Sequence, residues 1–428
     1  MATAESSTGL SFDATAALDP RPTPFPDRIV LTWNDDPATT QAVTWRTDAS
    51  VDSGFAFLMF ADSAPEAKDV RRFEATTTSL EASSGLAHYH SVVFRGLLPG
   101  TRYAYRVGSD AGLSEWFLFR TADLDPGTET ALSAQIVGFA PFTFLYMGDA
   151  QNDHLTWWSR TIRAAYAAAP DARFIVHAGD LVSHGDDDAQ WEAWFQAGGW
   201  IHAMLPCIPA PGNHEYLKST GKKGPFTSHW REVFTLPENG IPGLEEANYF
   251  LDYQGVRIVT LNTYQDLPAQ AEWLERVLSD NPNRWTVAAF HYPIYSGYGT
   301  RNNAELRALV KPILEKHHVD LVLTGHDHVY ARGQAPVGDY APGDSTSPKP
   351  VLGTSGPVYV ISVSGPKQYE VNAPWAKRYG ENVQLYQIIH VSADTLRYES
   401  RTVTGELYDA FDLVKQEDGA ARVVERAE

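Results

Sequence analysis

Two histidines lie two residues apart in the stretch LVLTGHDHVYAR, residues 321–332, after the four residues LVLT, which predict a buried strand. Imidazole nitrogens are common metal ligands, yet histidines in a glycine-flanked turn are also ordinary polar loop residues. The choice between these interpretations depends on whether other candidate ligands converge on His326 and His328.

Four further motifs in the same part of the chain follow apolar segments and contain residues able to bind a metal. They are MGDAQND with Asp149 and Gln151, AGDLVSHG with Asp180, APGNHEY with Asn213 and His214, and AAFHYP with His291. Each is weak alone, because Gly-Asp and Gly-Asn are common in turns and a single histidine is often simply buried. Ligands of open α/β sheets bind at the carboxyl ends of the strands, so the repetition favours one shared site. Its mixed oxygen and nitrogen donors suit Zn, Mn or Fe better than Ca or Mg.

The composition predicts a globular protein with a sizeable core, since 43% of the 428 residues are hydrophobic and 12% are aromatic. A formal charge of −19 argues against nucleic acid as a stable partner and against anionic membrane surfaces. The single cysteine, Cys207, excludes an internal disulfide and a cysteine-rich zinc site. No apolar run approaches the roughly 20 residues that span a bilayer, and MATAESSTGL lacks the features of a signal peptide.

The pattern of strands changes along the chain. Short alternating strands such as QAVTWRT and RYAYRVG predict a β-sandwich, whereas apolar strands such as FTFLYM, separated by helical stretches, predict an α/β domain. Strands return from about residue 356 and are expected to complete a second sheet of that domain. We expect an extended arm (1–26), the β-sandwich (27–122), a linker (123–141), the α/β domain (142–414) and a charged tail (415–428).

The motif series ending in Gly-His-x-His resembles the calcineurin-like metallophosphoesterases and, among them, the purple acid phosphatases. RIVLTWNDDPATTQAVTWRT and EWFLFRTA resemble the fibronectin-like N-terminal domain of the latter, and LYQIIHVSADTLRYESRTVTGELYDAFDL resembles their C-terminal strands. The resemblance covers nearly the whole chain past residue 25. It implies a fibronectin-III-like sandwich followed by a four-layer α/β/β/α domain, and a secreted or periplasmic protein.

The same resemblance implies a centre of two metal ions, Fe, Zn or Mn, bridged by Asp180. It assigns Asp149 and His328 to one ion, and it assigns Asn213, His291 and His326 to the other. His214 is implied to contact the phosphate or to protonate the leaving group. The expected reaction is hydrolysis of a small phosphate monoester by a metal-activated water. A phosphodiesterase or a nucleotide pyrophosphatase would use the same centre, and an inactive binding or adhesion protein is the hypothesis from another class.

The sequence departs from the family pattern at three positions. Ser183 stands where purple acid phosphatases have the tyrosinate that gives the colour. Gln151 stands where other metallophosphoesterases have a histidine, and it either supplies a neutral ligand or hydrogen-bonds a bound water. Arg301 lies where the family has further histidines, and it is either a charged fork for phosphate oxygens or a solvated charge at a helix start.

Two clusters outside these motifs have both a functional and an ordinary interpretation. Lys218, Lys222 and Lys223 would suit a substrate with several phosphates or are plain surface lysines. Trp157 and Trp158 could stack on an aromatic leaving group, but we expect at least one of them in the core of the domain.

Overall fold

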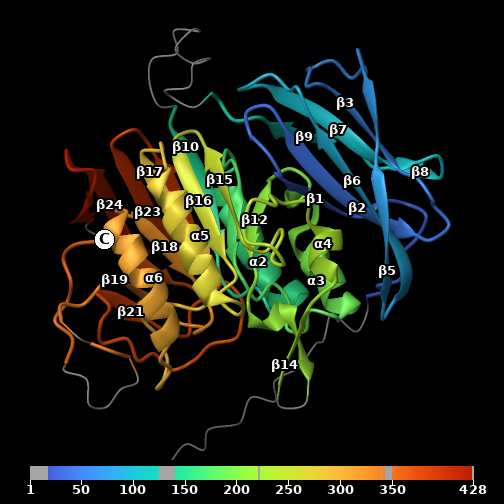
Figure 1. Cartoon of the computed structure of the whole chain (residues 1–428). Coiled ribbons are helices and arrows are strands. Elements are labelled where there is room, and N and C mark those ends of the chain that lie inside the picture. The colour runs from blue at the N-terminus through green and yellow to red at the C-terminus, as the bar shows by residue number, and fades with distance from the viewer. Residues whose placement is uncertain (1–17, 125–139, 220–221, 339, 343–348, 427–428) are drawn as a thin grey trace, which may run out of the picture.

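The computed structural model describes residues 18–124, 140–219, 222–338, 340–342 and 349–426. It consists of a β-sandwich, drawn in blue in Figure 1, followed by a larger α/β domain. Residues 18–26 of the expected arm contain no helix or strand, and most of the expected linker lies outside the described residues.

The β-sandwich has one sheet in the order β1-β2-β6-β5 and a second in the order β4-β3-β7-β8, with β9 paired to β7. Its core contains aromatic and aliphatic side chains from both sheets, including Val43, Trp45, Leu58, Phe94 and Tyr105. The strands are β1 (Asp27–Thr32), β2 (Gln41–Asp48), β3 (Phe55–Phe60), β4 (Arg71–Glu74), β5 (Thr76–Ala82), β6 (Gly85–Phe94), β7 (Arg102–Ser109), β8 (Gly112–Leu113) and β9 (Phe117–Arg120).

The α/β domain contains two seven-stranded sheets. The first has the order β12-β11-β10-β22-β23-β24-β25, and β10, β11 and β12 run parallel. Its strands are β10 (Phe142–Met147), β11 (Ile175–Ala178), β12 (Cys207–Ala210), β22 (Leu385–Val391), β23 (Thr395–Thr402), β24 (Leu407–Lys415) and β25 (Ala421–Glu425).

The second sheet has the order β15-β16-β17-β18-β20-β19-β21, and its strands β16, β17, β18 and β20 run parallel. Its strands are β15 (Tyr249–Tyr253), β16 (Val256–Leu261), β17 (Trp285–Phe290), β18 (Leu321–Thr324), β19 (Tyr330–Gln334), β20 (Val358–Ile361) and β21 (Arg378–Gly380). The strands after residue 356 are therefore divided, since β20 joins this sheet and β22 joins the first.

Helices cover the outer faces of the two sheets. Asp187 caps α3 through a hydrogen bond from Ala189 N, and Pro268 lies in the first turn of α5, where no backbone donor is required. The helical segments are η2 (His154–Trp158), α2 (Ser159–Ala168), α3 (Asp188–Gly198), η3 (Gly199–Ile201), η4 (Asn213–Glu215), α4 (His229–Val233), α5 (Leu267–Ser279) and α6 (Ala304–Lys316). A hairpin of β13 (Tyr216–Ser219) and β14 (Lys222–Phe226) follows η4.

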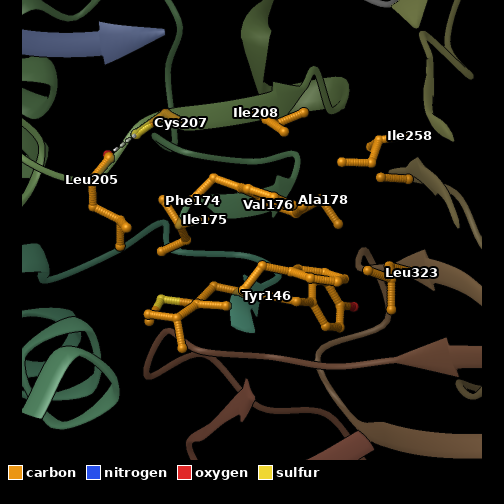
Figure 2. Packing of buried hydrophobic residues seen from close by; sticks show 14 of the residues in the cluster. Tyr146, Phe174, Ile175, Val176, Ala178, Leu205, Cys207, Ile208, Ile258 and Leu323 are labelled. Carbon is orange, nitrogen blue, oxygen red and sulfur yellow. Dashed lines mark hydrogen bonds between the residues drawn. The ribbon is translucent and has the colours of Figure 1, made fainter. Parts of the chain in front are cut away.

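The alternation of side chains along the strands produces the layers. Val259, Ala288 and Val322 pack in one cluster with residues of α5 and α6, whereas their neighbours Ile258 and Leu323 belong to a second cluster with β10 and β11. Figure 2 shows Ile258 and Leu323 beside Tyr146, Val176 and Ala178 of the first sheet. Side chains of η2, α2 and α3 extend that cluster on the other side. The domain therefore has four layers, α/β/β/α, as expected.

The β-sandwich is joined to the α/β domain by a buried ionic cluster. Arg28 of β1 donates to Asp188 at 2.6 Å and to Glu192 at 3.0 Å, both on α3. Arg46 of β2 donates to the same two carboxylates and to Asp27. Both guanidinium side chains are 1% exposed. The charges are paired and hydrogen-bonded, which buried charges require.

The C-terminal segment corrects one expectation. Residues 415–428 were expected to form a charged tail, but Ala421–Glu425 forms β25, which pairs antiparallel with β24 at the edge of the first sheet. An edge strand is paired on one side and open on the other, and charged side chains such as those of Arg422 and Glu425 are typical of such strands. Among the described residues, no helix is both long and apolar enough to cross a membrane.

Candidate metal centre

The candidate ligands occupy the carboxyl ends of five parallel strands. Asp149 follows β10, Asp180 follows β11, Asn213 follows β12, His291 follows β17, and His326 and His328 follow β18. Because the two sheets pack face to face with these ends on one side, residues up to 179 positions apart meet in one site. The site is thus built where the strand ends of an open α/β fold place ligands.

The loops after these strand ends have an unusual backbone conformation and contain closely packed glycines. Asp149, Asp180, His326 and His328 have φ angles of 46°, 51°, 72° and 49°, in the left-handed region. A Cβ atom on Gly212 would lie 2.2 Å from Asp180 Oδ1, and one on Gly325 would lie 2.4 Å from Asp149 Oδ2. The glycines of the GNH and GHDH motifs therefore leave space for the carboxylates.

Two groups of donor atoms have metal-site spacing. The ligand atoms of Asp180, His291 and His326 all lie within 4.8 Å of one another, and so do those of Asp149, Asp180 and His328. Asp180 is the member common to both groups. A carboxylate has two oxygens, so it can bind two cations about 3.5–4 Å apart.

The histidines are oriented by backbone carbonyls. His291 Nδ1 donates to Ala178 O at 2.8 Å, and His328 Nδ1 donates to Lys367 O at 3.0 Å. The Nε2 atom of His291 therefore faces Asp180 Oδ2 at 3.0 Å, and that of His328 faces Asp149 Oδ1 at 3.6 Å. A carbonyl that accepts from one ring nitrogen fixes the tautomer and leaves the other nitrogen for a metal.

Two buried amide oxygens complete the donor set. Asn213 Oδ1 and Gln151 Oε1 are buried, and neither has a hydrogen-bond partner among the described residues. Gln151 Nε2 lies 2.9 Å from Asp180 Oδ2 and 3.1 Å from His328 Nε2, so this amide group lies between two candidate ligands. A buried polar atom without a partner is costly, and a bound cation would remove that cost. The residues present therefore fit a centre of two metal ions.

The electrostatics of the cluster agree with that fit. Burial raises the pKa of Asp149 well above its ordinary value. Burial also acts to raise the pKa of Asp180, but His291 and His214 hold it below its ordinary value. Burial acts to lower the pKa of His291, yet Asp180 raises it to about 9. The charge of Asp149 is therefore unfavourable in this buried position unless a cation lies beside it, whereas the charge of Asp180 is already stabilised by its histidine neighbours.

His214 lies beside Asp180, the carboxylate common to both donor groups. Its backbone N–H donates to Asp180 Oδ1 at 2.9 Å, its Nδ1 donates to Ser183 O at 2.6 Å, and its Nε2 lies 3.8 Å from Asp180 Oδ2. Ser183, at the position of the missing tyrosine, has a buried Oγ for which the described part of the chain offers no hydrogen-bond partner. The Ser183 segment therefore reaches the site through its carbonyl group.

Arg301 is close to the centre but contacts protein groups. Its Nη1 donates to Asp327 Oδ1 at 2.7 Å and to His326 O at 3.0 Å. Its guanidinium carbon lies 5.0 Å from the ring of Tyr298 and 5.5 Å from that of Tyr369. The side chain is 30% exposed, so it supports the GHDH turn and also borders the opening of the site.

The tryptophans and lysines named from the sequence lie in η2 and in the hairpin of β13 and β14. Trp158 is buried and stacks on Trp194, which confirms that one tryptophan of the pair is in the core, while Trp157 is 41% exposed. Lys218 lies in β13, and Lys222 and Lys223 lie in β14; the surroundings of these three side chains lie outside the described structure.

Three residues that hold the site in place through hydrogen bonds were not predicted from the sequence. Glu215, the last residue of GNHE, accepts hydrogen bonds from the backbone N–H groups of Asp180, Leu181 and Gly212. Burial and then the charge of Asp180 raise the pKa of Glu215 to about 7. Asp327 accepts from Ser296 and Gly297, and Lys367 supplies the carbonyl for His328. Glu215 has a signal in the sequence, because it is a charged residue directly after Asn213 and His214, whereas the contact of Lys367 with His328 has no local signal.

The chain matches two family models. Residues 142–330 match the calcineurin-like phosphoesterase domain, and residues 26–121 match the N-terminal domain of purple acid phosphatases. Acid phosphatase type 7 of Danio rerio is 25% identical over 418 residues, which cover 88% of this chain and 88% of the relative. Acid phosphatase type 7 of Homo sapiens is 26% identical over 80% of this chain and 78% of its own length.

Solved structures agree with the two-domain fold. A purple acid phosphatase from yellow lupin (Lupinus luteus) aligns with a TM-score of 0.70 at 18% identity, over 92% of this chain and 75% of its own. The structure of PhoD aligns with a TM-score of 0.66 at 13% identity, over 94% and 93% of the two chains. Fold and family models together identify a calcineurin-like phosphoesterase domain in residues 142–330. The domain that precedes it, in residues 26–121, is the purple acid phosphatase N-terminal domain, so the chain is similar to purple acid phosphatases in both of its domains.

Proposed function

We propose that the protein hydrolyses phosphate monoesters as an acid phosphatase, using two metal ions at the centre described above. The observation that carries the proposal is the position of Asp180, which shares one donor group with His291 and His326 and another with Asp149 and His328. The acid phosphatase names of the relatives from Danio rerio and Homo sapiens support the same activity.

The proposed ligands divide into two sets around the bridging Asp180. Asp149 and His328 would hold one ion, with Gln151 beside them; Asn213, His291 and His326 would hold the other. When bound, the two ions would supply charge for the phosphoryl oxygens and lower the pKa of a water toward about 7. The buried amide oxygens of Gln151 and Asn213 favour their assignment as ligands. Iron, zinc and manganese are all compatible with these donors.

His214 is assigned to proton transfer. The Ser183 carbonyl accepts its Nδ1 hydrogen, so Nε2 is the nitrogen on the side of Asp180 and of the substrate. A proton held at Nε2 can be donated to the oxygen of the leaving alcohol, a contribution typically worth about 10²–10⁴-fold. The 2.6 Å hydrogen bond keeps the ring in the orientation that this transfer requires.

Phosphate recognition in this acidic protein requires local cations. Arg301 borders the site, although Asp327 engages part of its guanidinium group. Lys367 Nζ lies 5.4 Å from the centre of the Tyr369 ring, and that ring lies 4.8 Å from the ring of His328. Among the described residues, Lys367 forms no ion pair with a carboxylate. We assign Arg301 and Lys367 to the orientation of phosphate oxygens.

Secretion of the protein stays a prediction from the family resemblance.

The test combines metal analysis with paired substrates. The protein is loaded separately with iron, zinc and manganese, and hydrolysis of p-nitrophenyl phosphate and bis-p-nitrophenyl phosphate is measured from pH 4 to 8. We expect two ions per chain and a higher kcat/KM for the monoester. A preference for the diester would identify a phosphodiesterase, and two bound ions without hydrolysis of either ester would overturn the enzymatic assignment.

A further inference from the structure

A cavity of about 390 Å³ lies beside the metal centre, between the segment that follows β16 and the segment that enters α6. Thr263, Tyr264 and Gln265 line it on one side, and Tyr292, Asn303 and Glu305 line it on the other. Its volume is within the range of small-molecule sites, about 300–1,000 Å³. Nothing in the metal chemistry assigns a use to this space.

Tyr292 connects the cavity to the metal centre. It directly follows the candidate ligand His291, and its ring centre lies 4.2 Å from that of the candidate ligand His326. Because Tyr292 also lines the cavity, this space begins one side chain away from the ligands. A group attached to a phosphate at the centre can therefore reach it.

Three tyrosine rings form a continuous row along this side. The ring of Tyr264 lies 5.8 Å from that of Tyr292 and 4.8 Å from that of Tyr216, two residues beyond His214. The row therefore extends from His326 to the segment that carries the proposed proton donor. Tyr216 is fixed by hydrogen bonds, since its hydroxyl accepts from Asn262 Nδ2 at 2.8 Å and donates to Gln265 Oε1 at 3.1 Å.

The charges around the cavity are negative. Asp266 and Glu305 are both exposed on its rim, and the described residues that line it include no lysine, arginine or histidine. Arg307, nearby, donates to Asn302 Oδ1 at 2.7 Å. An anionic group in the cavity would face two carboxylates, whereas an uncharged ring would contact aromatic faces and amide groups.

We propose that this cavity is the leaving-group site of the enzyme and that it accepts an aromatic group without negative charge, held against Tyr264 and Tyr292. The proposal rests on the proposed phosphomonoesterase function. It adds a substrate class, aryl phosphates with neutral rings, and it names Tyr264 as a residue that determines specificity. Aromatic pairs contribute about 0.5–1.5 kcal/mol beyond buried area, which corresponds to about 2- to 13-fold in affinity.

Binding of phosphonates tests the cavity without requiring turnover. Titration calorimetry on the metal-loaded protein compares phenylphosphonate with methylphosphonate, which carry the same charged group. We expect tighter binding of the phenyl compound and a 2- to 13-fold loss of that preference in Tyr264→Ala and Tyr264→Leu, as the stacking contribution predicts (about 0.5–1.5 kcal/mol). The matched control is Tyr379→Ala, because Tyr379 is 58% exposed on β21 and does not line the cavity. Its preference should equal that of the wild type.

A charged phosphonate tests the effect of the carboxylates on the rim. 4-Carboxyphenylphosphonate should bind more weakly than phenylphosphonate, and this difference in affinity should be smaller in Glu305→Gln. Equal binding of the phenyl and methyl compounds, or a preference unchanged in both Tyr264 variants, would overturn the leaving-group site and leave the phosphatase assignment intact. If neither phosphonate bound and no monoester were hydrolysed, the proposed function itself would fail and the leaving-group site with it.

Discussion

His214 donates its Nδ1 hydrogen to the carbonyl oxygen of Ser183 at 2.6 Å, so its Nε2 is the ring nitrogen nearer to Asp180. Asn213, the preceding residue, has a buried amide oxygen that finds no hydrogen-bond partner in the described part of the chain. Two neighbouring side chains thus have environments that suit different work, one for proton transfer and the other for metal binding.

The first prediction separates these two roles. His214→Ala should keep both ions and lose the proton delivered to the leaving group, so kcat should fall about 10²–10⁴-fold with alkyl phosphates and much less with p-nitrophenyl phosphate. Asn213→Ala should instead lower metal occupancy and activity together. Elemental analysis and steady-state kinetics on both substrates measure the difference. Equal losses on both esters with metals intact would indicate that His214 stabilises the phosphoryl charge instead.

The second prediction concerns the bridge. Asp180→Ala removes the carboxylate common to both donor groups, so the variant should retain neither ion and have no detectable phosphatase activity. The β-strands of both sheets should persist, which circular dichroism checks. Two ions per chain in this variant would exclude Asp180 as the bridge.

The third prediction concerns colour. Because Ser183 stands at the tyrosinate position, the iron-loaded protein should lack a strong tyrosinate-to-iron charge-transfer band in its visible spectrum. Tyr292 and Tyr369 are the tyrosines in ring contact with candidate ligands. If a band appeared and then disappeared in Tyr292→Phe or Tyr369→Phe, that tyrosine would be a metal ligand and the expectation of a colourless centre would be wrong.

The fourth prediction concerns acid stability. Burial lowers the pKa of His177 and of His202 from 6.5 to about 3 each. The unfolded chain therefore binds more protons than the folded one between pH 6.5 and about 3, so stability is complete above pH 6.5 and decreases as the pH falls. At pH 5.5 each histidine should cost about 1.4 kcal/mol.

His202→Phe tests this dependence, since a phenyl ring can keep the stacking on Trp194, whose ring centre lies 4.0 Å away. Urea unfolding is compared at pH 7.5 and 5.5 in wild type and variant. The decrease in unfolding free energy on acidification should be smaller in the variant by about 1.4 kcal/mol, the contribution of one histidine. The same decrease in both proteins would mean that His202 does not titrate in this range.

The sequence is sufficient to predict the parts of the site that are local. Apolar runs such as FTFLYM define buried parallel strands, and the polar residue after each run then lies at a strand end. The shared position of Asp149, Asp180 and His291 therefore follows from the sequence alone. The order of the two domains is also predictable. Strands of the sandwich alternate apolar and polar residues with a period of two, whereas buried strands of the α/β domain are continuous apolar runs, and a few residues are enough to distinguish these patterns.

What the sequence does not predict depends on contacts between distant segments. His328 is oriented by a carbonyl 39 residues later in the chain, and Glu215 bonds backbone N–H groups 33 to 35 residues before it. Short polar strands are also missed. The segment ARVVE forms β25, yet its short, partly charged sequence was expected to be part of a tail. Its residues are only partly buried and it pairs with β24, so no strong pattern of apolar residues marks it as a strand.

The ionic cluster between the two domains limits where this chain can be divided. A fragment beginning at residue 142 would contain every candidate ligand, yet it would lack the guanidinium groups of Arg28 and Arg46 that pair with Asp188 and Glu192. Asp188 would keep its contact with His229 Nε2 at 3.2 Å. Removing one partner of a buried ion pair typically destabilises a protein by about 3–5 kcal/mol. Since α3 begins five residues after Ser183, whose carbonyl orients His214, the damage would reach the histidine that we propose as the proton donor. The sandwich is therefore an integral part of the enzyme, and a module that replaced it would have to supply its own cations to Asp188 and Glu192 of α3.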